Sequence, residues 1–394
     1  MSEQQEVTFN RRRFLQLTGA VGVSVATGGV LAACSSTGGS ASGAATSAAS
    51  VAPPAASPST AAAPTGTFNW MTWSDHWIQS QLDKIAADIN ISTQISELAG
   101  NAEGYAKLKE VKGQLDMISG DALWVRDAYY KDGLIEPFDI NELKVAAQLY
   151  PFARQFEIWT KPEGYLGYPF GWSPISIYYN TAEVSPAPDS WGVLLDPKYK
   201  GRVVVENQPE EIVAYMGKAA GFDDVYNMTD EQLATVKGLL EQLKPNILRF
   251  AQQATDSVNA MISEEAWLIT GNFGNEDRVK DGGGPEIKGY IPKEGTVGWM
   301  DAEMIVKDGA NSSLIFPFLE KSQQAENIAA NFIQHGRPLF SEKAYQVLTD
   351  QGHKDRADRY RWTESEAILS KTTLKGPGTS TEKSIQLFNE IFGA

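Results

Sequence analysis

Cysteine is nearly absent from this sequence, since Cys34 is the only one among 394 residues. One cysteine excludes an internal disulfide, so the folded part of the chain is expected to be held together by its hydrophobic core alone. Histidine is also scarce: His76, His335 and His353 lie far apart, without the four-residue spacing of a helical metal site. We therefore predict neither a disulfide framework nor a metal or cofactor site.

Long apolar runs and an excess of positive charge are also missing after the first 33 residues. No later stretch approaches the roughly 20 apolar residues that a bilayer-spanning helix needs. The chain has 34 Lys and Arg against 49 Asp and Glu, for a formal net charge of −15. An acidic surface disfavours nucleic acid and mildly suits cationic ligands, so no nucleic-acid partner is expected.

The first 66 residues have the features of an export signal followed by a tether. Residues 10–16, NRRRFLQ, resemble a twin-arginine signal, and Leu31-Ala32-Ala33-Cys34 resembles a bacterial lipobox. We expect residues 1–33 to be a signal peptide and Cys34 to be lipidated, because a buried core cysteine would leave the Arg pair unexplained. Residues 34–66, rich in Ala, Ser and Pro, are expected to form a disordered tether that holds the protein to the membrane outside the cytoplasm, in the periplasm or at the cell surface.

From residue 67 onward, short apolar segments alternate with amphipathic ones, which predicts α/β layers with mostly parallel sheets. The length of this part is enough for two lobes. The predicted strands are 67–73, 92–96, 115–119, 175–180, 201–207 and 266–272, and the predicted helices are 78–89, 209–220 and 229–243, the last of them capped by Thr229.

No catalytic set stands out in this part of the chain. Residues 171–175, GWSPI, lack the closing glycine of a nucleophile elbow, and residues 282–284, GGG, lack the Lys-Ser/Thr of a phosphate-binding loop. We therefore assign no catalytic residue and predict a binding protein. An exported hydrolase with a carboxylate pair, a cofactor enzyme exported by the twin-arginine route and a surface adhesin remain alternatives.

The segment 292–306, PKEGTVGWMDAEMIV, reads as a strand in which Trp299 and Asp301 share one face. An indole beside a carboxylate suits an organic cation, which gains a cation–π contact from one and a charge-assisted hydrogen bond from the other. The alternative is a half-buried strand with a packed Trp and a solvated Asp.

Four segments resemble the extracellular solute-binding proteins of ABC importers, in particular the spermidine/putrescine-binding group. They are residues 115–139, 168–181, 189–207 and 292–301. The resemblance extends over nearly all of the chain after residue 66, and a lipobox followed by a small-residue tether is how Gram-positive members are anchored.

The resemblance implies a two-lobed α/β fold of the periplasmic-binding-protein type, with two crossing strands at the hinge and the ligand in the interlobe cleft. It assigns residues 67–173 and 299–345 to lobe 1, and residues 174–298 and 346–394 to lobe 2. The implied partner is an ABC permease, and the implied state is a monomer.

The resemblance also implies a ligand site. Trp299 matches a cleft Trp that contacts the methylene chain of the ligand, and Asp301 matches a cleft Asp that binds an ammonium group. Trp73 matches a stacking Trp, His76 stands where the family has a cleft Tyr, and Glu211 matches a cleft Glu that takes an amine.

Other positions depart from the family pattern. Gln208 replaces a cleft Asp, Gly271 replaces a cleft Trp, and His353 falls near a late cleft Tyr. Asp121 stands where the family has a Ser and would return the acid that is lost at Gln208. The expected ligand is a polyamine such as spermidine or putrescine, and a different amine, an amino acid derivative or a sugar remains open.

Overall fold

The computed structural model describes residues 65–111 and 113–393. The predicted signal peptide, the Cys34 lipidation site and the tether up to residue 64 lie outside these residues. The last two residues of the predicted tether already belong to the fold, because the Thr65 amide donates to Asn90 O (2.8 Å) and the Ser92 amide donates to Gly66 O (2.9 Å). In residues 65–111 and 113–393, no helix is both long and apolar enough to cross a membrane.

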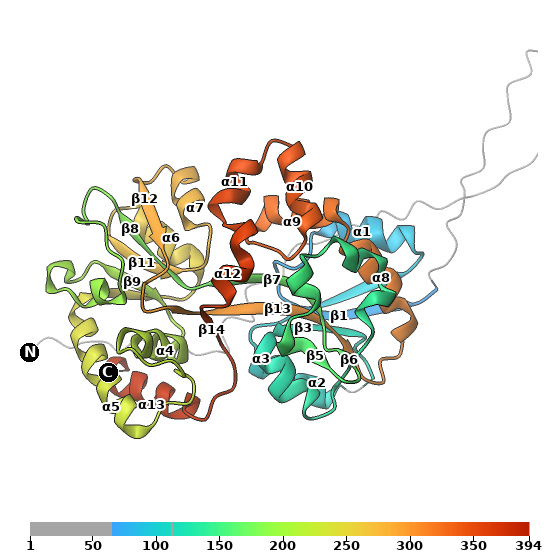
Figure 1. The fold of residues 1–394 in the computed structure, drawn as a ribbon, viewed down its shortest axis with the longest axis horizontal. Helices are drawn as coiled ribbons and strands as arrows, with labels where there is room; N and C mark the ends of the chain where they lie inside the picture. Colours follow the sequence, from blue (N-terminus) through green and yellow to red (C-terminus); the bar gives the residue numbers. More distant parts are fainter. Residues whose placement is uncertain (1–64, 112, 394) are drawn as a thin grey trace, which may run out of the picture. The chain divides into compact units, whose positions relative to one another are not determined.

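The described chain forms two α/β lobes, each built on its own sheet (Figure 1). The first sheet has the order β14-β13-β3-β1-β2, with β4 and β7 also paired to β13, and the second has the order β10-β9-β11-β8-β12. The strands of the first sheet are β1 (Thr67–Thr72), β2 (Ser92–Glu97), β3 (Met117–Asp121), β4 (Ile135–Glu136), β7 (Tyr168–Pro174), β13 (Thr296–Val306) and β14 (Thr372–Leu374). Those of the second are β8 (Ser176–Asn180), β9 (Val203–Glu206), β10 (Ile247–Ala251), β11 (Leu268–Gly271) and β12 (Ile287–Tyr290), and β5 (Thr160–Lys161) pairs with β6 (Gly164–Tyr165) in a small hairpin.

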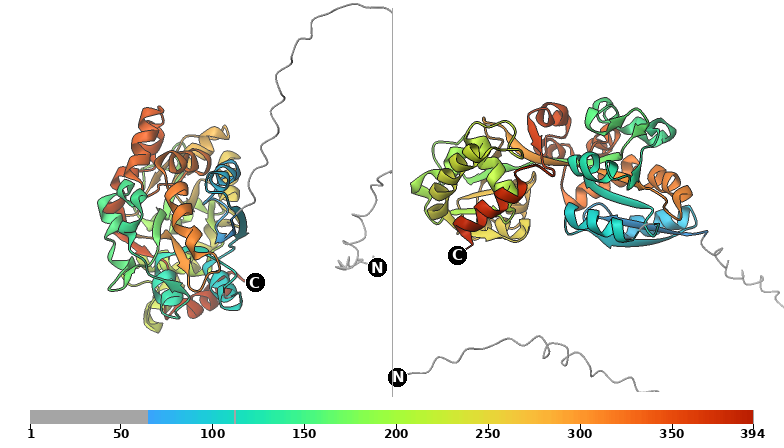
Figure 2. Two further views of the ribbon diagram at one scale, coloured as in Figure 1. Left: turned by 90° about the vertical axis from the view of Figure 1, so that its right-hand side faces the viewer. Right: turned by 90° about the horizontal axis from the view of Figure 1, so that it is seen from below.

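Helices pack around both sheets (Figure 2). They are α1 (Gln79–Asp88), α2 (Asn101–Glu110), α3 (Ala122–Trp124), α4 (Pro209–Ala219), α5 (Asp230–Leu243), α6 (Ala254–Ile262), α7 (Asn275–Asp281), α8 (Ile315–Ser322), α9 (Ala325–His335), α10 (Glu342–Asp350), α11 (Lys354–Arg359), α12 (Ser365–Leu369) and α13 (Thr381–Phe392).

The predicted strands and helices all form, with shifts at their ends. The strand predicted at 115–119, for example, runs from Met117 to Asp121. The Thr229 cap is confirmed as part of a capping box, in which Thr229 and Gln232 each accept a backbone N–H of the other. The prediction of mostly parallel sheets is wrong. Strands β13 and β8 run antiparallel to most of their neighbours, because each belongs to a segment that crosses between the lobes.

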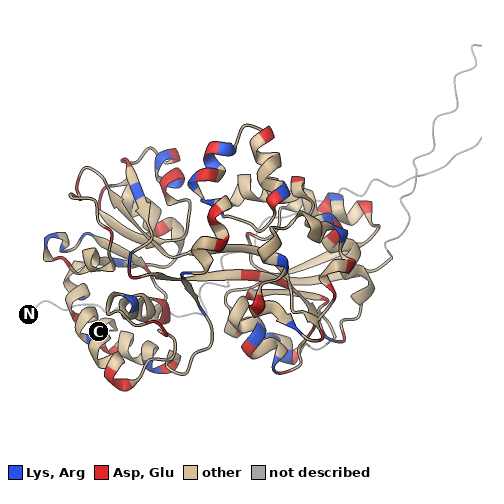
Figure 3. Cartoon of the chain, in the orientation of Figure 1, with Lys and Arg blue, Asp and Glu red and all other residues tan. Residues whose placement is uncertain are grey.

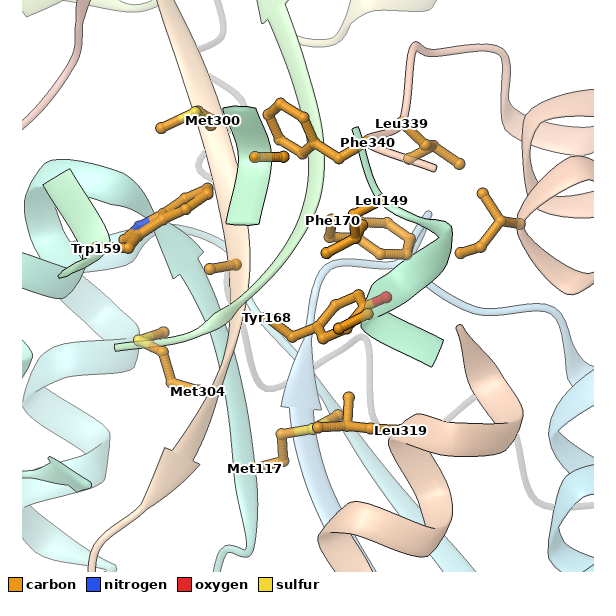
Figure 4. Packing of buried hydrophobic residues seen from close by; sticks show 14 of the residues in the cluster. Met117, Leu149, Trp159, Tyr168, Phe170, Met300, Met304, Leu319, Leu339 and Phe340 are labelled. Atoms are coloured by element: carbon orange, nitrogen blue, oxygen red, sulfur yellow. The ribbon is translucent and has the colours of Figure 1, made fainter. Parts of the chain in front are cut away.

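The chain passes between the lobes three times. Only Ile175 separates β7 from β8. Strand β13 contributes Val297 to the second core and Met300 to the first, and residues 375–380 lead from β14 to α13. Figure 4 shows side chains of β7 and β13, among them Phe170 and Met300, packed in the first core. The third connection adds to the two crossing strands that the family resemblance implies.

The predicted lobe boundary at residue 346 is wrong. Leu348, Trp362 and Leu369 belong to the first hydrophobic core, whereas Phe388 and Ile391 of α13 belong to the second. The reason lies in α10, which packs on α9, and in the Trp362 side chain, which contacts Phe332 of α9 with 4.9 Å between ring centroids. The first lobe therefore extends through α12.

Candidate functional site

Strand β13 brings two carboxylates to the region where the chain crosses between the lobes. Asp301 lies directly opposite Asp121 of β3 in the antiparallel register, and both side chains are buried, with residue exposures of 5% and 3%. Figure 3 shows acidic positions in the middle of β13. Like charges placed opposite each other repel, so this pair needs a neighbouring cation or a proton.

Lys375 supplies one such cation, on the connection between β14 and α13. Its Nζ lies 3.6 Å from Asp121 Oδ2, and its backbone N–H donates to Gly298 O (2.9 Å). Burial lowers the pKa of Lys375, but the carboxylates of Asp121, Glu211 and Asp301 outweigh burial and raise it above its ordinary value. The ammonium group is therefore held among acids from both lobes.

The close approach of the crossing segments requires a glycine at position 298. A Cβ atom there would lie 2.5 Å from Ser173 O, 2.7 Å from Thr372 Cγ2 and 2.9 Å from the Pro174 Cα. Strands β7, β13 and β14 therefore touch at Gly298, directly beside the backbone contact of Lys375.

His76 supplies the second cation. Its Nδ1 lies 2.6 Å from Glu303 Oε1 and its Nε2 lies 3.2 Å from Asp301 Oδ2, while its ring stacks on Phe170 with 4.1 Å between centroids. Burial would lower the pKa of His76, but the two carboxylates outweigh it and raise the pKa to about 9. The imidazole is therefore protonated at neutral pH and holds a proton between Asp301 and Glu303.

Glu303 is fully buried, and both of its carboxylate oxygens have hydrogen-bond partners. Its Oε2 accepts hydrogen bonds from Ser119 Oγ (2.6 Å) and Trp70 Nε1 (3.1 Å), in addition to the His76 contact at Oε1. The sequence analysis did not select Glu303, although the period of two that relates Trp299 to Asp301 extends to it. The sequence of this strand alone does not predict that Glu303 is buried.

The second lobe contributes Glu211, which lies in the first turn of α4 and is 6% exposed. Burial, Glu210 and Asp121 raise the pKa of Glu211, and the Lys375 ammonium opposes them. Burial and the nearby Glu211 also raise the pKa of Glu206, at the end of β9, to about 7. Burial is the largest cause of both pKa shifts, and neighbouring carboxylates add to it.

We use the name acidic cluster for Asp121, Asp301, Glu303 and Glu211. Lys375 interacts electrostatically with Asp121, Glu211 and Asp301, and His76 contacts Asp301 and Glu303, so four acids share two cations. Oδ1 of Asp301 is buried and receives no N–H from the described residues, while the Asp121 carboxyl lies within hydrogen-bonding reach of Asp301, and burial together with Asp301 raises the pKa of Asp121 well above its usual range. A carboxylate oxygen in that position is costly unless a donor meets it, so the cluster is suited to an additional cation.

Comparison with known proteins agrees with this architecture. A model of the family described as bacterial extracellular solute-binding protein matches residues 117–361. The chain belongs to this family. Among curated relatives, the spermidine/putrescine-binding periplasmic protein of Escherichia coli strain K12 is 24% identical over 303 residues, which cover 75% of this chain and 83% of that protein.

Solved structures of solute-binding proteins share the fold. A putative spermidine/putrescine ABC transporter protein from Listeria monocytogenes superposes with a TM-score of 0.70 at 18% identity, over 82% of this chain and 98% of that one. The PotD protein from Streptococcus pneumoniae gives a TM-score of 0.69 at 18% identity, over 83% and 98%. At these identities the structures show the fold, and the ligand has to be argued from this chain's own residues.

The two tryptophans expected in the cleft of this solute-binding protein are both half-buried. Trp299 Nε1 donates to Asn272 Oδ1 (2.8 Å), which lies just beyond β11 in the second lobe. Trp73 packs against the first core, and its buried Nε1 has no hydrogen-bond partner among the described residues. The alternative of a packed Trp beside a solvated Asp is wrong for the carboxylate, because Asp301 is buried.

The remaining positions of the implied site lie as follows. Gln208 is exposed and precedes α4. Gly271 has no room for the family's Trp, because a Cβ atom would lie 2.6 Å from Asn275 Nδ2 and 3.3 Å from Glu206 Oε1. His353 is half-buried at the start of α11, where its amide donates to Leu348 O. The structure thus brings together the implied acids, and it adds Lys375 and Glu303, which the sequence analysis missed.

Proposed function

We propose that this protein is the substrate-binding component of an ABC importer and that it captures a small organic amine at the acidic cluster. The observation that supports this most is the imbalance of four buried carboxyl groups against two cationic side chains, with Asp301 Oδ1 receiving no N–H from the described residues. An amine would supply the missing N–H donors and the missing positive charge.

Spermidine, putrescine and related amines are the first compounds to test. In the expected pose, methylene groups lie against Trp73 and Trp299, and ammonium groups lie at Asp301, Glu211 and Asp121. The curated relatives support this choice, because they are named as spermidine/putrescine-binding and putrescine-binding periplasmic proteins. The departures at Gln208 and Gly271 favour a wider panel that also includes other amines, amino acid derivatives and sugars.

Delivery to a permease and attachment to the membrane complete the proposal. The mature protein begins at lipidated Cys34, remains tethered outside the cytoplasm, acts as a monomer and hands its ligand to the permease subunits. No catalytic step is part of this function.

Calorimetry with purified protein tests the amine assignment. Asp301→Asn should weaken amine binding by about 2 to 5 kcal/mol, which is the usual cost of breaking a buried charge pair. The matched control is Asp281→Asn, at the exposed end of α7, which makes the same chemical change away from the cluster and should leave affinity unchanged. If no amine binds the wild type, or if both variants bind alike, the cluster is not the ligand site.

A further inference from the structure

Lys375 occupies the place at which the expected pose puts a ligand ammonium group. Its Nζ lies 3.6 Å from Asp121 Oδ2, and its ammonium interacts favourably with Glu211 and Asp301. These are the three carboxylates that a bound polyamine was expected to use. The chain therefore already holds one cation at the position of a ligand cation.

The Lys375 side chain also resembles one end of a polyamine chemically. A lysine side chain is four methylene groups that end in an ammonium group, which is also the terminal unit of putrescine and of one end of spermidine. One third of the Lys375 side chain is exposed (33%), and its backbone is fixed by the hydrogen bond from its amide to Gly298 O. Lys375 is thus a tethered aminobutyl group that reaches the acidic cluster without any loss of translational freedom.

The acids that His76 and Lys375 do not already neutralise determine how many ligand ammonium groups the acidic cluster can bind. His76 lies between Glu303 and Asp301, and Lys375 lies nearest Asp121. Asp301 is the member with a buried oxygen that receives no N–H from the described residues, and its half-buried neighbour Trp299 offers an apolar wall. One further ammonium group finds its position at Asp301, whereas a second would have to displace Lys375.

We propose that Lys375 determines the charge class of the ligand: the site takes an amine that presents a single ammonium group to Asp301, and Lys375 excludes a second ammonium group from Asp121 and Glu211. This inference rests on the proposed function and narrows it. A diamine or triamine binds tightly only when Lys375 is removed, because the tethered ammonium otherwise competes with the second charged nitrogen.

Two matched compounds test this with the full-length protein. Putrescine and 4-amino-1-butanol have the same four-carbon chain, and the second ammonium group of one is a hydroxyl in the other. Calorimetry should show that the wild type binds 4-amino-1-butanol at least as tightly as putrescine. In Lys375→Met, which keeps the unbranched length and loses the charge, the affinity ratio should shift at least tenfold towards putrescine.

Two further variants separate this role from a general charge effect and from a structural one. Lys371→Met removes an exposed cation from the same segment and should leave the ratio unchanged. Lys375→Arg keeps the charge and should keep the wild-type ratio. A folded Lys375→Met protein whose ratio is unchanged, or which loses affinity for both amines, would show that Lys375 is only an interlobe ion pair.

The wild-type measurement keeps the inference testable if Lys375→Met does not fold. Putrescine that binds the wild type ten times more tightly than 4-amino-1-butanol overturns the inference and leaves the amine-binding function intact. If neither amine nor any other cation binds the wild type, the proposed function fails and the inference fails with it.

Discussion

Raising the pH from 6.5 to 9 should destabilise the folded protein, because His76 holds its proton between two buried carboxylates. The pKa of His76 is raised from 6.5 to about 9 on folding. A group whose pKa is higher in the folded state contributes stability that is fully present below about pH 6.5 and is lost as the pH rises through 9. A difference of 2.5 pKa units corresponds to about 3 kcal/mol of unfolding free energy.

Urea unfolding followed by tryptophan fluorescence measures this loss. Glu206 titrates in part of the same range with the same sign, because its pKa is raised to about 7 in the folded protein and a carboxyl of this kind also stabilises less as the pH rises. The titration should therefore be followed in a Glu206→Gln background. In that background the free energy of unfolding should fall by about 3 kcal/mol between pH 6.5 and pH 9.5.

Adding His76→Gln to this background gives the decisive comparison. The added substitution should lower stability at pH 6.5, where Glu303 and Asp301 lose their cation, and should make little difference at pH 9.5, where the imidazole is already neutral. The two stability curves should therefore converge as the pH rises. If they stay parallel, or if the parent curve is flat within about 0.5 kcal/mol, the His76 proton does not stabilise the fold and the reasoning is refuted.

Two further predictions concern the ligand and the anchor. Trp299→Leu should weaken amine binding by about 1 to 2 kcal/mol, because it removes the aromatic face and keeps an apolar wall; unchanged affinity in calorimetry would remove Trp299 from the site. Cys34→Ala should release the protein from the membrane fraction, as measured by fractionation and immunoblot, and continued membrane retention would contradict lipidation at this residue.

The parts of the fold that one segment encodes could be predicted from the sequence. The alternation in residues 292–306 gives β13, and Thr229 directly before α5 gives its N-terminal cap. The lobe boundary could not be placed in the same way. The helices after residue 341 are amphipathic, and amphipathicity shows that a helix buries one face without showing which lobe covers it.

In the candidate site too, some features could be predicted from the sequence and others depend on contacts between distant parts of the chain. The placement of Asp121 and Asp301 came from family resemblance, and the register of β3 against β13 puts them opposite each other. The sequence around Lys375 does not indicate a role in the site. Its contact with Asp121 joins two positions that are 254 residues apart in the chain and forms only in the folded protein. Glu303 lies on a predictable face, but its stability as a buried acid depends on His76 and on donors from two other strands.

The glycine at position 298 makes ligand preference sensitive to a change that touches no charged group. Three separate crossings are in contact there, and the same residue's carbonyl anchors the amide of Lys375. One added methyl group would have to push β7 or β14 aside, and the Lys375 ammonium would move with its backbone. A natural variant at this position could therefore recognise a different amine while keeping every acid of the cluster, so relatives cannot be sorted by ligand from their carboxylates alone.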